Sequence, residues 1–355
     1  MSVAQRARYL AWVVALVPAC FQPSYDRPAC SASGECPGEL TCNAGFCVPS
    51  GEAISCVGLA MTCGPSGTDS CCNSLVIPGG TYYRSYDTAR DEESGTRDFP
   101  AMLSRFRLDK YEVTVGRFRA FVDAGSGTQA SPPTTGAGAH ALITGSGWDA
   151  AWNTSLETSS EALKTEVKCK GTIPTWTDTP GGNESRPINC ITWFEAMAFC
   201  AWDGGFLPTE AEWNYAATGG NAQRAYPWSE DLNTLDGMHA SYRDGTDCVG
   251  DGMPGCALTD LVAVGTKPSG NGRWGQSDLA GNVFEWTLDW WAETYQLPCV
   301  DCADITPSVR PEDATRVFRG GSFYGVATDL RTAKRRNTTP INRDGGIGVR
   351  CARAP

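Results

Sequence analysis

Cysteine is the feature that most constrains how this chain can fold. Its 355 residues include 17 cysteines, which is typical of proteins that fold in an oxidising compartment, where thiols pair. Eight of them fall within 43 residues: Cys30, Cys36, Cys42, Cys47, Cys56, Cys63, Cys71 and Cys72. That segment has few large apolar side chains and cannot build its own hydrophobic core, so we expect a small disulfide knot. The segment contains neither histidine nor paired C-x-x-C motifs, which disfavours a zinc site.

The first 20 residues have the pattern of an export signal. Arg6 and Arg8 precede an apolar run over residues 9–17, and Ala19 precedes Cys20. The last four residues look like a bacterial lipobox, in which the cysteine is lipidated. Without Cys20 sixteen cysteines remain, an even number that can pair completely. We expect a signal peptide over 1–19 and a lipid-anchored stalk or knot over 20–74, on a bacterial outer membrane or cell surface. Ordinary secretion is the alternative.

Composition excludes several classes of function. A net charge of −11 and an isoelectric point near 4.8 give no attraction toward nucleic acid, so a membrane is expected to be reached through the lipid anchor only. His140 and His239 are the only histidines, which excludes a three-histidine metal centre. The 40 glycines and 22 prolines predict a body rich in loops.

From residue 75 onward the composition is that of a globular domain, expected over 75–355. Thr114 precedes an apolar i, i+3, i+6, i+7 stripe that predicts a helix. Thr192 with Glu195, and Thr209 with Glu212, form capping boxes that predict the starts of two more helices. Strands are expected over 81–85, 106–111, 315–319 and 347–352.

Five segments of this domain carry a resemblance to a known family. They are IPGGTYYRS (77–85), DKYEVTVGRFRAFVDAG (109–125), RPINCITWFEAMAFCAWDGGFLPTEAEWNYAATGG (186–220), DLAGNVFEWTLDWW (278–291), and FRGGSF with RRNTTPINRDGGIGVRCA (318–352). In this order they resemble the formylglycine-generating enzyme, or sulfatase-modifying factor, family. The resemblance implies one irregular, loop-rich α+β domain of the C-type-lectin-like kind, following the disulfide-rich N-terminal segment.

Several prominent side chains in these motifs are better explained by structure than by chemistry. Trp213 and Trp286 are expected in the core, because large aromatic side chains dominate burial. Glu212 is expected to cap its helix rather than act as an acid. Three arginines are expected to pair with buried carboxylates or loop carbonyls: Arg319, Arg331 and Arg350.

Residues 278–285, DLAGNVFE, are the best metal candidate. Two carboxylates flank a glycine turn whose backbone carbonyls can point inward. Calcium prefers roughly six to eight oxygen ligands, drawn from carboxylates and carbonyls of this kind. The resemblance implies structural calcium held by the side chains of Asp278 and Glu285 and the backbone oxygens of Gly281 and Val283. A capped turn without an ion is the alternative. The acid-rich stretch 244–252 is a weaker second candidate.

The later cysteines suggest disulfides within the domain. Cys200 and Cys351 match positions that the resembled enzymes join. Cys299 and Cys302 form a C-x-x-C, a spacing shared by redox dithiols and by simple loop staples. We expect a local disulfide there, because the sequence around it lacks the basic residues that depress a thiol pKa. Two further pairings are candidates, although connectivity cannot be read from sequence: Cys248 with Cys256 and Cys169 with Cys190.

The chain departs from the resembled oxidases where their chemistry occurs. Those enzymes hold copper(I) with two cysteines in the segment after GGSF, because soft thiolates select that ion. Here the segment reads GGSFYGVATDLRTAKRR, and no cysteine occurs between Cys302 and Cys351. Ser322 would lie in the family's cleft, but the residues that follow it are not soft ligands: Gly325, Val326, Ala327 and Asp329. Copper is therefore not expected.

Two functions from different classes remain. The first is a monomeric, non-oxidase binding or scaffold module of the cell envelope. It would present a loop-rich surface to a peptide, protein or glycan, or perform an unrecognised reaction in the cleft that the family uses for catalysis. The second is a formylglycine-generating oxidase that uses copper and oxygen, with ligands brought from elsewhere, Cys299 and Cys302 among them. We favour the first, because serine and aspartate cannot supply soft ligands. Iron-dependent sulfoxide synthesis is disfavoured by the histidine count.

Overall fold

The computed structural model describes residues 30, 31, 36, 40–43, 46–49, 53–88, 96–307, 309–310 and 313–355. Cys20 and the expected signal peptide over 1–19 lie outside the described residues. Within the described ranges, no helix combines the length and apolar character needed to cross a membrane.

Regular secondary structure is short throughout the molecule. The α-helices are α1 (Val115–Asp123), α2 (Ser160–Glu166), α3 (Trp193–Trp202) and α4 (Glu210–Thr218). The strands are β1 (Leu40–Asn43), β2 (Phe46–Pro49), β3 (Ser74–Ile77), β4 (Gly80–Tyr83), β5 (Pro100–Leu103), β6 (Phe106–Asp109), β7 (Arg243–Asp244), β8 (Asp247–Cys248), β9 (Phe284–Trp290), β10 (Cys299–Val300), β11 (Arg316–Arg319), β12 (Arg336–Thr338), β13 (Ile347–Gly348) and β14 (Ala352–Arg353). The expectation of an irregular, loop-rich mixed fold is confirmed.

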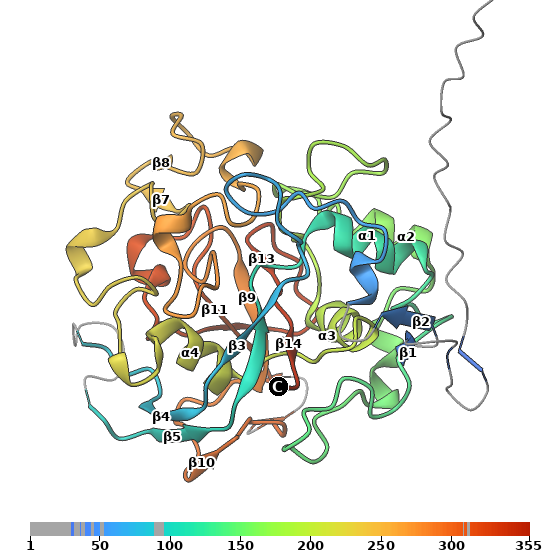
Figure 1. Ribbon diagram of the computed structural model, residues 1–355, viewed down its shortest axis with the longest axis horizontal. Coiled ribbons are helices and arrows are strands. Elements are labelled where there is room, and N and C mark those ends of the chain that lie inside the picture. The colour runs from blue at the N-terminus through green and yellow to red at the C-terminus, as the bar shows by residue number, and fades with distance from the viewer. Residues whose placement is uncertain are drawn as a thin grey trace, which may run out of the picture.

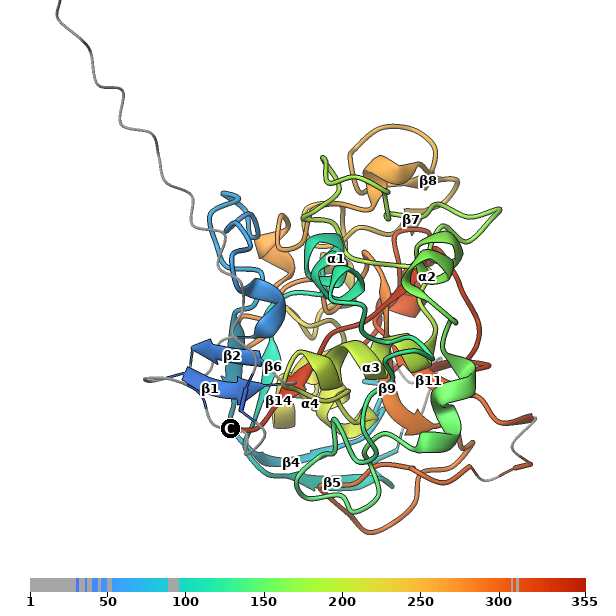
Figure 2. The same cartoon turned by 90° about the vertical axis from the view of Figure 1, so that its right-hand side faces the viewer.

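Three small sheets and two hairpins organise this body. The strand orders are β12-β11-β9-β13, β14-β6-β3 and β10-β5-β4, and the hairpins are β1-β2 and β7-β8. Strand β9 is antiparallel to β11 and parallel to β13. Figure 1 shows β9 and β11 in the middle of the body and β4, β5 and β10 along its lower edge. In both views α1 and α2 lie on the side away from β4 and β5 (Figures 1 and 2).

The helices begin where the capping residues predict. The Thr114 side chain accepts from the N–H of Arg117 at the start of α1. Complete capping boxes start α3, with Thr192 and Glu195, and α4, with Thr209 and Glu212. Helix α4 ends at Gly219 in the left-handed region, φ 66°, which glycine adopts without a steric penalty. Local sequence therefore fixes these helix ends.

The largest hydrophobic cluster joins α1 and α3 to the central strand β9. Phe118, Phe199 and Trp286 are fully buried in it. A second cluster packs Trp213 of α4 against β4, β5 and β6. Both tryptophans therefore fill core, as their size predicts.

A buried arginine connects distant parts of the chain. Arg117 of α1 is fully buried, and its Nη2 lies 3.0 Å from Asp109 Oδ2 and 2.6 Å from Asp203 Oδ2. Arg353 of β14 approaches the same two carboxylates. Burial alone raises the pKa of Asp203, but the two guanidinium groups outweigh it and leave that pKa lowered.

Residues 53–74 pack against the domain. Ile54 is buried in the largest cluster, the N–H of Ser55 donates to Asp203 Oδ1 at 2.7 Å, and β3 starts at Ser74. The expected boundary at residue 75 therefore falls inside the packed body. Composition does not predict this packing, because the segment has no apolar run and is held to the domain by a few specific contacts.

The strand expectations differ most at the C-terminus. Residues 347–352 form two separate strands, β13 and β14, which belong to different sheets. The break places Arg350 between them, where its side chain is fully buried. Sequence reasoning also missed β9, because both of its faces are buried and it lacks the alternation of a half-exposed strand.

Disulfides connect these short elements. Cys200 bonds Cys351 across 151 residues, which ties α3 to the last strand, and Cys299 bonds Cys302, both as expected. The remaining pairs described are Cys56–Cys72, Cys63–Cys71, Cys169–Cys190 and Cys248–Cys256.

Loop length predicts how much two of these bonds stabilise the protein. Cys200–Cys351 closes 151 residues and Cys248–Cys256 closes 8. By chain entropy, replacing both cysteines with alanine should cost about 2–3 kcal/mol more for the first pair than for the second. Urea unfolding of the two double variants measures this difference, and equal losses would contradict the entropic account.

Candidate functional site

The segment that resembles the family's oxidase cleft starts at the end of β11. Gly320 and Gly321, with φ of 102° and 78°, turn the chain sharply and bring Ser322 into the interior, where it is fully buried. Within the described residues its hydroxyl has no hydrogen-bond partner. Gly325 lies directly against it, since its N–H donates to the Ser322 carbonyl at 2.8 Å. Ser322 is therefore enclosed by its own loop.

The residues after Ser322 form a 3-10 turn, η8 (Ala327–Leu330). Asp329 caps this turn and lies 2.5 Å from Arg336 of β12, so its carboxylate is already paired. No sulfur occurs in this loop. Cysteines 56 to 351 all form disulfides, including Cys299 and Cys302, the alternative copper ligands.

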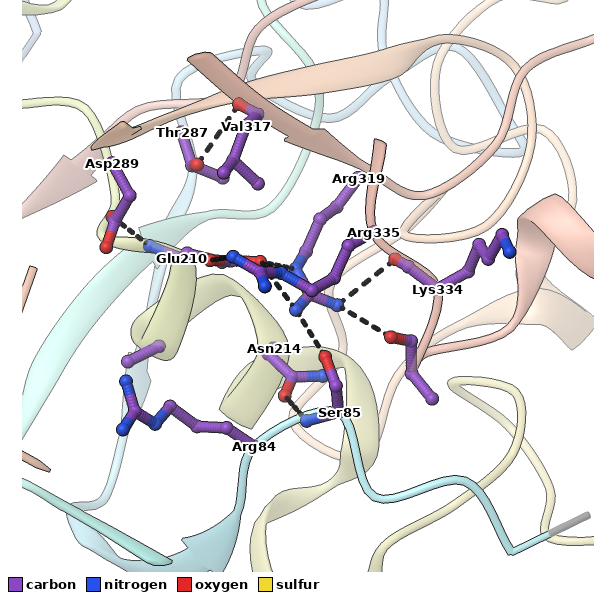
Figure 3. A network of polar contacts seen from close by, with 12 residues as sticks. Arg84, Ser85, Glu210, Asn214, Thr287, Asp289, Val317, Arg319, Lys334 and Arg335 are labelled. Atoms are coloured by element: carbon purple, nitrogen blue, oxygen red, sulfur yellow. Dashed lines mark hydrogen bonds and ion pairs between the residues drawn. The ribbon is translucent and has the colours of Figure 1, made fainter. Parts of the chain in front are cut away.

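A buried polar network lies at the end of β11, next to this segment (Figure 3). Glu210, at the start of α4, lies between Arg319 of β11 and Arg335, with its Oε1 2.9 Å from Arg319 Nε and 2.6 Å from Arg335 Nε. Arg319 Nη2 also donates to Ser85 Oγ at 2.7 Å. The N–H of Glu210 donates to Asp289 of β9 at 2.6 Å. These contacts join α4, β9 and β11 and fix the end of β11, where the Ser322 segment begins.

The network shifts the pKa values of two carboxyl groups in opposite directions. Burial alone raises the pKa of Glu210, but Arg335 and Arg319 outweigh it and lower the pKa to about 2. Burial, together with the nearby charge of Glu210, raises the pKa of Asp289 to about 7. Glu210 is therefore the anion that balances the arginines.

The expected calcium ligands lie in a second buried cluster. Both oxygens of Glu285 accept from Arg350, at 2.7 and 3.0 Å, and Oε2 also accepts from Trp213 Nε1 at 2.7 Å. Asp278 Oδ2 accepts from the N–H of Gly265 at 2.6 Å. Within the described residues, no group of three or more histidine, cysteine, aspartate or glutamate side chains is arranged to hold a metal ion. Glu285, Arg350 and Trp213 thus form a hydrogen-bonded cluster in which the guanidinium pairs with the carboxylate.

This second cluster nevertheless holds more acid than base. Glu112 lies beside it and accepts from Asn282 Nδ2 at 2.7 Å. Burial and the charges of Asp278 and Glu285 raise the pKa of Glu112 well above its usual range. Burial also raises the pKa of Asp278 to about 6.

The acid-rich stretch 244–252 is a surface hairpin. Asp247 Oδ1 accepts from the N–H of Gly255, and Asp251 Oδ1 accepts from the N–H of Met253. Asp244 lies on β7, and all three aspartates are exposed. Asp247 and Asp251 close turns on the surface.

Arginine pairing follows the sequence expectation. Arg319 pairs with Glu210 and Arg350 with Glu285, while Arg331 Nη1 lies 3.4 Å from Asp87 Oδ2. Glu212 caps α4 and also accepts from His140 Nε2 at 3.1 Å. Sequence reasoning missed the contact with His140, because the 125–147 loop gives no local signal of where it folds back.

Sequence reasoning also missed a pocket on the surface of the molecule. It holds about 660 Å³ and lies on the sheet of β4, β5 and β10. Its apolar walls include Tyr83, Met102 and Leu297, and Cys299 lies in its lining. Met102 and Leu297 are about half exposed, so the pocket opens to water.

The surroundings of the C-x-x-C differ from those that its sequence suggests. The adjacent residues in the chain are not basic, but the fold places an arginine beside the disulfide. Arg84, which directly follows β4, places Nη1 3.5 Å from Cys302 Sγ. The two residues are 218 positions apart, so only the fold brings them together.

Comparisons with known proteins agree with this architecture. Residues 61–355 match the model of the sulfatase-modifying factor enzyme 1-like domain. A formylglycine-generating enzyme from Streptomyces coelicolor is 30% identical over 294 residues, covering 78% of this chain and 87% of that protein. The hercynine oxygenase of Mycolicibacterium smegmatis is 27% identical, covering 79% of this chain and 60% of that protein. PvdO from Pseudomonas aeruginosa, 21% identical, has a TM-score of 0.54 over 79% of this chain and 94% of that one, which shows the fold alone.

The short sheets, capped helices and buried arginine pairs thus define a protein with a formylglycine-generating-enzyme-like fold. The chain belongs to the sulfatase-modifying factor enzyme 1-like family, as its motifs implied. The match begins at residue 61, before the expected boundary at 75, in agreement with the packing of residues 53–74.

The Glu210 network predicts a pH-dependent loss of stability. Glu210→Gln leaves two buried guanidinium groups without their anion and should cost about 3–5 kcal/mol at neutral pH. Because the folded pKa is about 2 against an ordinary 4.5, this contribution is complete above pH 5 and is lost as pH falls toward 2.

Urea unfolding of the wild type and the variant between pH 3 and pH 7 measures the effect. The gap between the two proteins should narrow as the pH falls. Exposed Glu293→Gln is the control and should leave stability unchanged at every pH. A gap that does not vary with pH would contradict the assignment.

Proposed function

We propose that this protein is an exported, lipid-anchored binding or scaffold module of the cell envelope that retains the sulfatase-modifying-factor fold without copper oxidase chemistry. The observation that carries the proposal is the distribution of sulfur. No cysteine lies between Cys302 and Cys351, and cysteines 56 to 351 are all paired. Copper(I) needs free thiolates, which this arrangement does not offer.

Export is supported by the N-terminal sequence and by the disulfides. The charged and apolar pattern before Cys20 suits a lipoprotein signal, with ordinary secretion as the alternative. Six disulfides within residues 56–351 suit an oxidising compartment. We propose a monomer that binds a peptide, protein or glycan through its loop-rich surface. The acidic balance argues against nucleic acid.

The alternative function is a formylglycine-generating oxidase, which the 30% identity to a relative of that name favours. It would need thiolates, and the C-x-x-C could supply them only after its disulfide is reduced. Ser322 cannot replace them, because a buried hydroxyl is a hard ligand.

Structural calcium at Asp278–Glu285 is a second, separate proposal. Its support is electrostatic: Glu112, Asp278 and Glu285 place three buried carboxyl groups around one guanidinium, that of Arg350. A bound cation would offset the remaining negative charge. The contacts of Glu285 count against it, since Arg350 and Trp213 already occupy both oxygens.

Copper binding separates the two functions. We expect the oxidised protein, titrated with Cu(I) against a competing chelator without oxygen, to bind no stoichiometric copper, and to form no aldehyde on a cysteine peptide in air. The Streptomyces coelicolor relative is the positive control. One tightly bound equivalent together with an aldehyde would reject the proposal. A Cys299→Ser/Cys302→Ser variant then shows whether that pair holds the metal.

Calcium is tested by thermal unfolding. If the ion binds the native state alone, calcium at 100 times its Kd should stabilise the protein by about 2.7 kcal/mol relative to EDTA. We expect a higher Tm in calcium, and no such gain in Asp278→Asn. An exposed Asp244→Asn variant should respond like the wild type. Equal Tm values in calcium and EDTA would remove calcium from the proposal.

A further inference from the structure

The Cys299–Cys302 disulfide lies beside the pocket on the sheet of β4, β5 and β10. Cys299 begins β10, which runs parallel to β5, and is part of the pocket lining. Cys302 is partly buried, and its Sγ contacts Arg84. The two sulfurs therefore have different surroundings: one borders an apolar cavity and the other contacts a guanidinium group.

Arg84 is a buried cation, with 4% of its surface exposed. Its Nη2 donates to the carbonyl of Gln296 at 2.7 Å, and its guanidinium lies 4.3 Å above the ring of Tyr295. Its remaining contact is Cys302 Sγ. Among the residues that the structure describes, these partners are a carbonyl, a ring and a sulfur. No carboxylate contacts Arg84 there, and Asp304 interacts with it only through longer-range charge.

A buried cation without a contacting anion favours a negative charge on its neighbour. If the S–S bond opened, a Cys302 thiolate would gain an ion pair with Arg84, and nearby arginine is what lowers the pKa of a cysteine thiol. A Cys299 thiolate would lie deeper in apolar surroundings, since Cys299 is a buried member, 4% exposed, of a hydrophobic cluster against which the partly buried Cys302 packs. Since a better leaving thiolate departs faster, attack should occur on Cys299 with Cys302 as the leaving group.

We propose that Cys299–Cys302 is an exchangeable disulfide that reacts with a thiol entering the 660 Å³ pocket. The entering thiol loses its proton to solvent, and its thiolate attacks Cys299 Sγ. A bond forms between the entering sulfur and Cys299, the Cys299–Cys302 bond breaks, and its electron pair leaves with Cys302 as a thiolate beside Arg84. The entering sulfur is oxidised and Cys302 is reduced, so no further reactant is required.

The pocket walls indicate the class of thiol. The pocket lining is mostly apolar and includes Tyr83, Met102 and Leu297. Three polar side chains also line it: Arg97, Asn221 and Gln223. A cysteine flanked by apolar groups would bury them there, whereas glutathione is polar and charged. This activity goes beyond the proposed binding role and does not depend on it.

Disulfide mapping tests the proposal on the full, oxidised chain. The protein is incubated with either glutathione or a short peptide with a cysteine between two leucines, quenched with N-ethylmaleimide and mapped by mass spectrometry. We expect the peptide attached to Cys299 and maleimide on Cys302, with a faster reaction for the peptide than for glutathione.

Cys248–Cys256 is the matched control disulfide within the same molecule. It also closes a short loop, and Cys256 is exposed, so it would open first if exposure alone governed the rate. We expect Cys299–Cys302 to open at least about tenfold faster. Equal or slower opening, or a peptide attached to Cys302, would overturn the proposal. A faster reaction with glutathione would contradict the inference that the entering thiol is flanked by apolar groups.

Arg84 is tested as a positioning residue. Arg84→Met should slow opening of Cys299–Cys302 by about tenfold, and Arg84→Lys should restore most of the rate because it keeps the charge. The control is Arg243→Met, since Arg243 of β7 pairs with Cys248 in register and should not alter Cys299–Cys302. An unchanged rate in Arg84→Met would overturn the role of Arg84. If that variant fails to fold, the comparison of the two disulfides in the wild type still decides the proposal.

Discussion

Buried pairing of arginine with carboxylate is the interaction on which this structure depends. Helices and strands are short, so backbone hydrogen bonds alone cannot hold the body together. Arg117 joins α1 to Asp109 and Asp203, while Glu210 pairs with both Arg319 and Arg335. Three of these four pairs join residues at least 86 positions apart in the chain. Because an unpaired buried charge is costly, each pair also specifies which segments must meet.

The same pairing explains how the fold can be retained where the family's copper chemistry is not expected. Arg319 and Glu210 position the end of β11 and the turn that follows, whatever side chains occupy the next residues. The side chains after Ser322 can therefore vary without disturbing the frame beneath them. The cysteines from Cys56 to Cys351 form covalent cross-links, and Cys200–Cys351 joins the residues farthest apart in the chain.

The contact between Arg84 and Cys302 shows how much a cysteine pair depends on its surroundings. In the sequence, Cys299 and Cys302 are candidates for a local disulfide next to the acidic Asp301. In space, Asp301 turns away to accept from Ser104, and Arg84 faces the sulfur. The electrostatic environment of the pair is thus decided by residues more than 190 positions distant.

The sequence by itself determined the family, the loop-rich character and the starts of three helices, because these follow from motifs and capping contacts within a few residues. It also indicated that Trp213 and Trp286 are core, and that no cysteine lies between Cys302 and Cys351. Only the tertiary structure decided which carboxylate each arginine binds, where His140 folds back, and that residues 53–74 belong to the body. It likewise divided 347–352 between two sheets and placed Arg84 against Cys302. The physical reason is range: capping and composition act over a few residues, whereas burial and charge pairing act between segments that only the folded chain brings together.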